Sequence, residues 1–307
     1  MALHDYVVEE VALDCSNGLL GRREALRRLG LLGVRGAAAA ALLAACSSDD
    51  DDTTSASTTG TPSPSSAALT STVAETSSTP STAGEEIRFA GPDGELIGVL
   101  ATATPARGAV LVIHENRGLT KHIRSIPPRL AADGYTALAI DLLSGQGGTA
   151  GMPSEGDATA ALGNAPTERL IADLRAGLDE LGRRAPEVEL AAIGFCFGGG
   201  MTWQLLAAGE PRLGAAVPFY GPYTEGSDLT GSPNAAVLGI YAELDDRVNA
   251  SLDAADAALT AAGLTHEMRV FDGVDHAFFN DTGPRYDAEA ATEAYQAMLD
   301  WFATHLA

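Results

Sequence analysis

The stretch of the sequence with the clearest chemical potential reads IGFCFGGG, over residues 193–200. A thiol, Cys196, stands there among glycines, directly after an apolar run. Glycine relieves crowding in a sharp strand-to-helix turn, whose central residue takes a strained backbone conformation. The pattern therefore matches the nucleophile elbow Gly-x-Ser-x-Gly, with cysteine in place of serine. A helix that begins at this point favours a thiolate, and the backbone N–H of Phe197 is expected to form half of an oxyanion hole.

Two other interpretations of Cys196 stay open from this motif alone. Most free cysteines are small, buried, hydrophobic residues with no chemical role. A dinucleotide-binding loop is also rich in glycine, but its glycine order differs, and no phosphate-binding lysine follows here. Residues further along the chain are needed to decide between them.

An acid and a base follow the cysteine in the order that an elbow nucleophile requires. The segment AELDDRVN places Asp245 and Asp246 after one apolar run, and DGVDHAFFND places His276 after another. In enzymes built on such an elbow, the chain order is nucleophile, acid, histidine. Each carboxylate could be an ordinary turn residue, and His276 a plain loop histidine. Three coincidences in the right order nevertheless favour a Cys-Asp-His triad.

The elements that must position these groups alternate along residues 85–307. Apolar runs predict strands at 96–102, 109–114, 136–141, 189–194, 214–219, 236–241 and 267–271, and helical periodicity predicts helices at about 122–134, 167–183, 198–208, 251–263 and 287–305. Such alternation predicts an α/β fold, with a mostly parallel central sheet flanked by helices. Functional residues in these sheets gather at the carboxyl ends of the strands, where the cysteine, the acids and the histidine all fall.

The composition limits the classes of partner. The formal net charge is -22, and Lys121 is the only lysine of the 307 residues. Binding to nucleic acid is therefore not expected, because neutralising phosphates requires clustered lysine and arginine. Electrostatic docking on anionic lipid is not expected either. Hydrophobic residues make up 46% of the chain, which is enough for a sizeable core.

The N-terminal residues 1–45 are typical of an export signal. Residues 22–46 read RREALRRLGLLGVRGAAAAALLAAC, with arginine pairs first and small residues last. The paired arginines resemble a twin-arginine signal, although Ala25 stands where that motif usually has phenylalanine. The apolar part is too short to span a bilayer, and Arg35 interrupts it. The final LAAC resembles a lipobox, which predicts lipidation of Cys46; simple cleavage that releases a soluble protein is the alternative.

Residues 46–84 are rich in Ser, Thr, Pro and Asp and poor in apolar residues. A segment of this composition cannot bury enough surface to offset the entropy of ordering it. We therefore expect a disordered tether that links residues 85–307 to a lipid anchor on the outer or periplasmic face of the cell membrane.

Residues 85–307 resemble the dienelactone hydrolase family of α/β-hydrolases over essentially the whole domain. The resemblance rests on VIHENRGL (112–119), GYTALAIDLL (134–143), GFCFGGG (194–200), YAELDDRVN (241–249) and DHAFFND (275–281). It implies a hydrolase of esters and lactones that needs no metal or organic cofactor. By position, the nucleophile is Cys196, the base His276 and the acid Asp245. Asp245 is preferred to Asp246 because the family has Gly-x-x-Asp at the strand end, and Ala242 occupies the glycine position.

The resemblance also implies roles for two residues after the strand at 109–114. Glu115 matches a family glutamate that contacts the cysteine and helps to create the thiolate as substrate binds. The backbone N–H of Asn116 would be the second donor of the oxyanion hole. The alternative is that HENRG is a plain polar loop. A zinc site of the H-E-x-x-H type is not expected, because the second histidine is missing.

The chain departs from the family at the two arginines that grip the carboxylate of a dienelactone. Gly145 and Asn280 stand at those positions. This predicts a preference for neutral esters or lactones, unless Arg117, Arg124 or Arg285 compensates. A thioesterase or a peptidase on the same triad remains an alternative function, as does a surface lipoprotein that keeps an inactive hydrolase scaffold.

Overall fold

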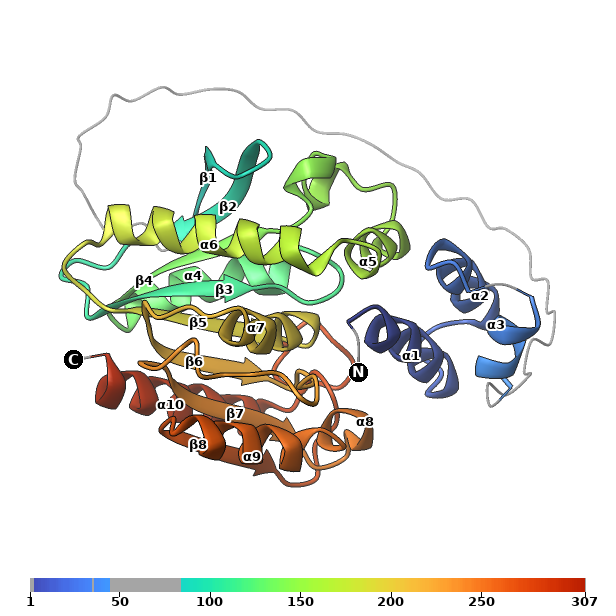
Figure 1. Ribbon diagram of the computed structural model, residues 1–307. Helices are drawn as coiled ribbons and strands as arrows, with labels where there is room; N and C mark the ends of the chain where they lie inside the picture. The colour runs from blue at the N-terminus through green and yellow to red at the C-terminus, as the bar shows by residue number, and fades with distance from the viewer. Residues whose placement is uncertain (1–2, 35, 45–83, 307) are drawn as a thin grey trace, which may run out of the picture.

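The computed structural model describes residues 3–34, 36–44 and 84–306 (Figure 1). Its core is an eight-stranded sheet in the order β1-β2-β4-β3-β5-β6-β7-β8. The strands are β1 (Glu85–Ala90), β2 (Glu95–Ala101), β3 (Gly108–Ile113), β4 (Tyr135–Asp141), β5 (Leu190–Phe195), β6 (Leu213–Phe219), β7 (Ala236–Ala242) and β8 (His266–Phe271). Strands β3 to β8 run parallel, whereas β1 and β2 pair antiparallel with their neighbours. The predicted mostly parallel sheet is confirmed.

Helices cover both faces of this sheet. They are α4 (Lys121–Ala132), α5 (Glu155–Gly163), α6 (Thr167–Arg184), α7 (Phe197–Ala207), α8 (Asp246–Asn249), α9 (Leu252–Ala262) and α10 (Ala288–His305). In Figure 1, α6 and α7 lie on one face and α4 and α10 on the other. A hydrogen bond of 2.7 Å from Tyr295 of α10 to Asp133, next to α4, ties the second pair together. The central strands β3, β4 and β5 are buried along their whole length, as expected for a sheet covered on both sides.

The register of the sheet brings the predicted functional loops to one edge. Ile113, the last residue of β3, is paired with Gly194 of β5. Ala242, the last residue of β7, is paired with Phe271, the last residue of β8. The segments that carry the candidate nucleophile, acid and histidine therefore leave the sheet at the same, carboxyl end.

Three short helices precede the sheet in the chain: α1 (Leu3–Ser16), α2 (Arg22–Leu31) and α3 (Ala37–Leu42). The sequence indicated an export signal here rather than packed helices, yet α1 and α2 pack against the hydrolase domain. Tyr6, Val7 and Val11 of α1 are fully or almost fully buried. Val7 and Val11 lie one turn apart and Tyr6 is next to Val7, so α1 has an apolar face that the interpretation as a signal did not consider.

Helix α5 forms part of the surface that receives these N-terminal helices. The side chain of His4 lies 3.0 Å from the carbonyl oxygen of Gly163, at the end of α5. A Cβ atom at Gly163 would lie 3.3 Å from Val7, and one at Gly156 would lie 2.5 Å from Arg27 of α2. Both glycines of α5 thus allow a close approach of the N-terminal segment.

No helix among the described residues is long and apolar enough to cross a membrane. Whether residues 1–45 act as an export signal concerns processing of the chain and stays a prediction. Cys46 and the predicted tether, apart from Gly84, lie outside the described residues.

Candidate active site

Cys196 stands on a strained turn between β5 and α7. Its backbone has φ 57° and ψ -116°, which few non-glycine residues adopt. A Cβ atom at Gly194 would lie 2.0 Å from the carbonyl oxygen of Gly198, and one at Gly198 would lie 2.3 Å from that of Ile113. The glycines on both sides of the cysteine are therefore required by contact with backbone. The sequence predicted this elbow, and the structure has it at the predicted place.

His276 and Asp245 are joined by a short hydrogen bond. The Nδ1 atom of His276 lies 2.5 Å from Oδ2 of Asp245, and both side chains are buried. The other oxygen, Oδ1 of Asp245, accepts a hydrogen bond of 3.2 Å from the backbone N–H of Val248, which fixes the carboxylate at the start of α8. Asp246, the other candidate acid, is exposed. The geometry thus pairs His276 with the carboxylate that the family pattern indicated.

The loops that carry this pair are fastened to each other. The backbone N–H of Leu244 donates to the carbonyl oxygen of Val274 at 3.0 Å, two residues before His276. The ring of Tyr220 meets the imidazole of His276 edge-on, with 5.1 Å between the ring centroids. Ala277, the residue after the histidine, has a φ of 65°. These contacts hold the imidazole over the elbow, with its Nε2 atom facing away from Asp245.

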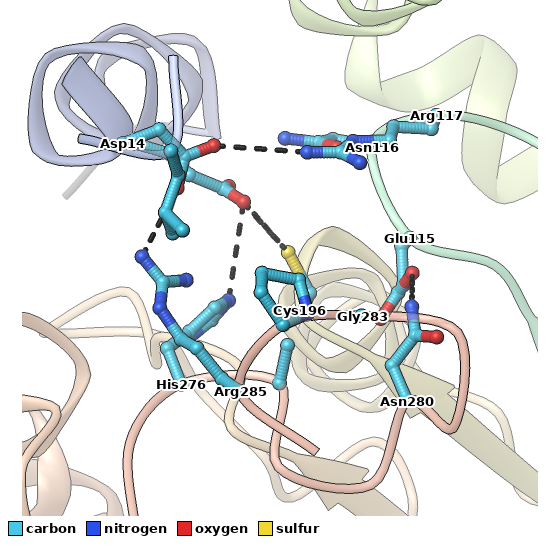
Figure 2. A pocket seen from close by; sticks show the side chains of 13 residues that line it. Asp14, Glu115, Asn116, Arg117, Cys196, His276, Asn280, Gly283 and Arg285 are labelled. Carbon is cyan, nitrogen blue, oxygen red and sulfur yellow. Dashed lines mark hydrogen bonds and ion pairs between the residues drawn. The ribbon is translucent and has the colours of Figure 1, made fainter. Parts of the chain in front are cut away.

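The groups proposed for an oxyanion hole lie beside the thiol. Phe197 is the first residue of α7, so its N–H has no acceptor within the helix. Gly198, the next residue, packs closely on Ile113 and His114, which lead into the turn that carries Asn116. Asn116, Cys196 and His276 line one pocket (Figure 2).

Glu115 lies in the same pocket but makes its hydrogen bond elsewhere. Its Oε2 atom accepts from the amide of Asn280 at 2.8 Å, and its Oε1 atom is buried without a partner among the described residues. Burial raises the pKa of this carboxyl, while the charges of His122 and Arg117 lower it in part. The contact with the cysteine that the resemblance implies is therefore not formed here, and Glu115 has one free oxygen with which to make it.

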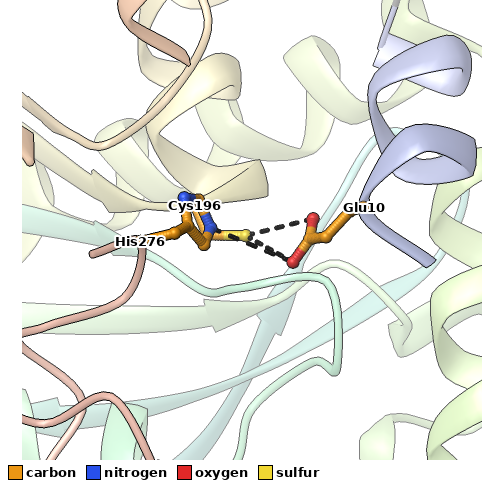
Figure 3. Close-up of side chains that lie close together, drawn as sticks. All are labelled: Glu10, Cys196 and His276. Carbon is orange, nitrogen blue, oxygen red and sulfur yellow. Dashed lines mark hydrogen bonds and ion pairs between the residues drawn. The ribbon is translucent and has the colours of Figure 1, made fainter. Parts of the chain in front are cut away.

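Helix α1 occupies the space directly above the thiol. The carboxylate oxygens of Glu10 lie 3.3 and 3.4 Å from Sγ of Cys196, and one of them lies 3.9 Å from Nε2 of His276 (Figure 3). The hydroxyl of Tyr6 lies 3.4 Å from the same Sγ and 3.4 Å from the same Nε2. The reactive faces of thiol and imidazole are thus both in contact with α1.

Charged residues of the domain hold α1 in this position. Arg285 reaches Asp14 of α1 at 3.1 Å, and Arg117 approaches the other oxygen of that carboxylate at 3.8 Å (Figure 2). The guanidinium of Arg247 lies 4.1 Å from the ring centroid of Tyr6, a cation–π contact, and donates to the backbone carbonyl of Tyr6 at 3.3 Å. An acidic, aromatic helix face therefore meets a basic surface around the pocket.

The electrostatics of this closed arrangement oppose catalysis. Burial raises the pKa of the Cys196 thiol and the Glu10 carboxylate raises it further, while His276 lowers it in part. Burial alone would lower the pKa of His276, but Asp245 and Cys196 hold it well above its ordinary value. Burial would raise the pKa of Asp245, yet His276 keeps it below its ordinary value. Burial and Glu10 thus both disfavour the thiolate that a nucleophilic attack on a carbonyl requires.

One group of the described residues could hold a metal ion. It consists of Glu10, Cys196 and His276, whose donor atoms lie within 4.8 Å of one another. These side chains already contact one another through the thiol, the carboxylate and the imidazole Nε2. The predicted hydrolytic chemistry uses two of them without a metal, and the expectation that no cofactor is required stays a prediction.

The sequence analysis missed the contribution of α1. Nothing in the family resemblance covers residues 1–84, and the arginine pairs directed attention to export. A signal was nevertheless present: Tyr6, Glu10 and Asp14 recur every fourth residue, so they share one face of a helix. That pattern predicts a helix with a polar stripe, but not which surface of the protein the stripe meets.

Comparisons with known proteins identify relatives of the domain that carries this site. Residues 96–306 match the model of the dienelactone hydrolase family. A candidate carboxymethylenebutenolidase of Escherichia coli O157:H7 is 35% identical over 207 residues, which cover 63% of this chain and 75% of that protein. A homologue from Saccharolobus solfataricus with the same designation is 27% identical over 246 residues, or 69% of this chain and 95% of that protein.

Solved structures show the same fold. The crystal structure of a candidate dienelactone hydrolase from Klebsiella pneumoniae is 30% identical, with a TM-score of 0.63, and the match covers 72% of this chain and 98% of that one. A dienelactone hydrolase-like promiscuous phosphotriesterase from metagenomic libraries is 26% identical, with a TM-score of 0.60, covering 73% and 98%. Each of these matches covers nearly the whole of the solved chain. The protein belongs to the dienelactone hydrolase family of α/β-hydrolases, the enzymes that hydrolyse esters and lactones.

Proposed function

We propose that the protein hydrolyses esters or lactones with Cys196 as nucleophile, His276 as base and Asp245 as the acid that orients the histidine. The observation that carries this proposal is the convergence of a strained cysteine elbow with a buried His276–Asp245 pair whose Nδ1–Oδ2 distance is 2.5 Å. A buried carboxylate on Nδ1 fixes the tautomer and leaves Nε2 to exchange a proton with the nucleophile.

The reaction then follows from the positions of these groups. The Cys196 proton passes to Nε2 of His276, and the sulfur forms a bond to the carbonyl carbon. The N–H groups of Phe197 and Asn116 stabilise the negative oxygen of this intermediate. The bond from carbon to the alcohol oxygen breaks, and His276 returns its proton to the leaving alkoxide. Water, deprotonated by the same imidazole, then hydrolyses the thioester and restores the thiol.

The surroundings of the pocket favour a substrate with a negative group, which differs from the preference indicated by the sequence. Gly145 and Asn280 indeed supply no cation, but Arg117 and Arg285 line the pocket and already hold the carboxylate of Asp14. Arg124 is directed elsewhere, to Glu86 at 2.6 Å. We therefore infer that two of the three arginines named from the sequence can replace the missing pair.

Export and lipidation remain part of this proposal. The arginine pairs at residues 22–28 and the LAAC sequence that ends at Cys46 support an exported hydrolase, anchored by a lipid on Cys46 to the outer or periplasmic face of the membrane. Labelling cells with a fatty-acid analogue tests the anchor, with the Cys46→Ser variant as control. Equal distribution of both proteins in the soluble fraction, without label, would refute it.

The test of the activity is a panel of chromogenic esters, thioesters, lactones and peptides. It is assayed with the full chain and with a chain cut at a protease site inserted within residues 47–84. We expect turnover of esters or lactones that the Cys196→Ala variant loses. Cleavage of thioesters or peptides alone would favour a thioesterase or a peptidase, and no turnover in either form would favour a binding protein on an inactive scaffold.

A further inference from the structure

The N-terminal helix makes its closest contacts with the two groups on which the proposed reaction depends. Glu10 and Tyr6 place three oxygen atoms at 3.3 to 3.4 Å from Sγ of Cys196. A substrate carbonyl must come equally near to be attacked, since reacting atoms are about 3–3.5 Å apart in a productive complex. Substrate and α1 therefore cannot occupy the site together.

The space that α1 leaves free is too small for a substrate. The pocket beside Cys196 has a volume of about 150 Å³. Sites for small-molecule ligands usually measure about 300–1,000 Å³. Glu10 and Asp14 of α1 form part of the wall of this pocket, and Cys196 itself is only 2% exposed. We therefore describe α1 as a plug: it fills the space next to Cys196, and only a small pocket remains beside it.

The plug is bound by several independent contacts. Its apolar face buries Tyr6 and Val7, and Leu3 lies near Gly200 of α7, where a Cβ atom would approach it to 3.5 Å. Its acidic face places Asp14 on Arg285 and Arg117. These contacts join residues more than 100 positions apart, so they depend on the folded hydrolase domain and not on the N-terminal segment alone.

We propose that α1 is an intramolecular inhibitor, which keeps the hydrolase closed in the unprocessed chain and is lost when residues 1–45 are removed. The helix lies within residues 1–45, the predicted export signal, so cleavage before Cys46 would release it. The protein would then be a proenzyme that opens only after export. The inhibition of turnover rests on the proposed hydrolase function, whereas the shielding of the thiol does not.

The first experiment loosens α1 in the full chain by a reversal of charge. Asp14→Arg places a cation against Arg285 and Arg117, while Asp5→Arg makes the same change of charge at an exposed position of the same helix. The readouts are the rate of alkylation of Cys196 by iodoacetamide, followed by peptide mass spectrometry, and kcat/KM for an active ester. Asp14→Arg should raise both by at least about tenfold, because an inhibited site reacts in proportion to its open fraction. Asp5→Arg should leave both unchanged.

The second experiment removes and returns the helix. Cutting a protease site inserted within residues 47–84, followed by gel filtration under mild denaturant and refolding, separates the N-terminal segment from the domain. The separated domain should gain the same activity, and a synthetic peptide of residues 1–20 should inhibit it competitively. A peptide with Asp14→Arg is the matched control and should inhibit at least about tenfold more weakly.

The outcomes separate the two proposals. Faster alkylation in Asp14→Arg without turnover of any substrate would keep α1 as a cover of the thiol and overturn the hydrolase function. If the protein turns over a substrate and neither Asp14→Arg nor removal of the helix changes the rate, the proposal that α1 is an inhibitor is wrong and the hydrolase function stands. Turnover that falls when α1 is loosened would show that Tyr6 and Glu10 assist the reaction, and it too would overturn the inhibitor.

Discussion

The carboxylate of Glu10 lies 3.3 Å from the sulfur of Cys196, although 186 residues separate the two in the chain. A negative charge at this distance disfavours a thiolate, and the pKa of the thiol is raised by burial and then by this charge. The site therefore contains the residues that the proposed reaction needs, but α1 covers the thiol and disfavours its ionisation. The predictions below test the residues and the closure separately.

The first prediction concerns the pH dependence of the thiol. The charged or titratable groups around Cys196 are Tyr6 and Glu10 of α1, Glu115, Arg247 and His276. Because Glu10 favours the protonated thiol, Glu10→Gln should lower the pKa of Cys196 and shift the alkylation profile toward lower pH. The measurement is the rate of iodoacetamide modification between about pH 5 and pH 10, which spans the range in which thiols ionise.

The half-buried Glu9 of the same helix offers a control, since Glu9→Gln removes an equal charge at a position that is more exposed than Glu10. If the pH profile of alkylation shifts equally in both variants, the overall charge of α1, and not the contact of Glu10 with the sulfur, sets the reactivity of Cys196.

The second prediction separates the two neighbouring aspartates. Asp245→Asn should reduce kcat by about 10³–10⁴-fold with little change in KM, because an amide no longer holds the imidazole in the required tautomer. Asp246→Asn should retain nearly full activity, since that side chain is exposed. The kinetics are measured in the Asp14→Arg background, so that access to the site is equal. Loss of activity in Asp246→Asn alone would reverse the assignment.

The third prediction concerns the charge of the substrate. In the domain separated from α1, where loss of the contacts to Asp14 cannot open the site, Arg117→Ala and Arg285→Ala should each raise KM for a lactone that carries a carboxylate and leave KM for a neutral ester almost unchanged. A charge-assisted hydrogen bond contributes about 1.5–3 kcal/mol, which corresponds to about a 10- to 100-fold change in binding. Arg124→Ala, whose guanidinium pairs with Glu86, is the control. Equal effects of the arginine variants on acidic and neutral substrates would refute a carboxylate site.

The fourth prediction concerns the glycines of the elbow. Gly194→Ala would place a Cβ atom 2.0 Å from a backbone oxygen, so the backbone itself has to move. We expect a loss of about 1–3 kcal/mol in the free energy of unfolding, measured by urea titration. Gly182→Ala, in α6 with nothing within 4 Å of the added atom, should instead stabilise the protein by about 0.5–1 kcal/mol. Equal stability of the two variants would contradict the close packing of the elbow.

Much of the hydrolase domain could be predicted because its signals are local. The apolar runs that form β3 to β8 are short and bounded by turn residues. The glycines of the elbow all lie within seven positions, 194–200, and together they predict a sharp turn. Strand β1 was missed, since only Ile87 and Phe89 are buried in it and it lies at the edge of the sheet. The small helix α8 was missed as well, because its four residues carry no periodicity.

The closure of the site could not be predicted, because it depends on a contact between distant parts of the chain. Tyr6 and Glu10, which meet the site, show no periodicity that would indicate their partner. The surface that receives α1 is assembled from α5, α7, Arg247 of α8 and the loop that carries Arg285. The composition of residues 22–46 also suits two purposes, since arginines and alanines serve an export signal and a helix equally well.

The most direct test of the central claim is the mass of the covalent intermediate. The Asp14→Arg variant and the wild-type chain are mixed with an active ester, quenched in acid within the burst phase and analysed by intact and peptide mass spectrometry. The account predicts one acyl group, attached to Cys196 as a thioester, at a higher level in the variant and absent from Cys196→Ala. Turnover of the ester with the acyl group on another residue, or with unchanged turnover in Cys196→Ala, would contradict it.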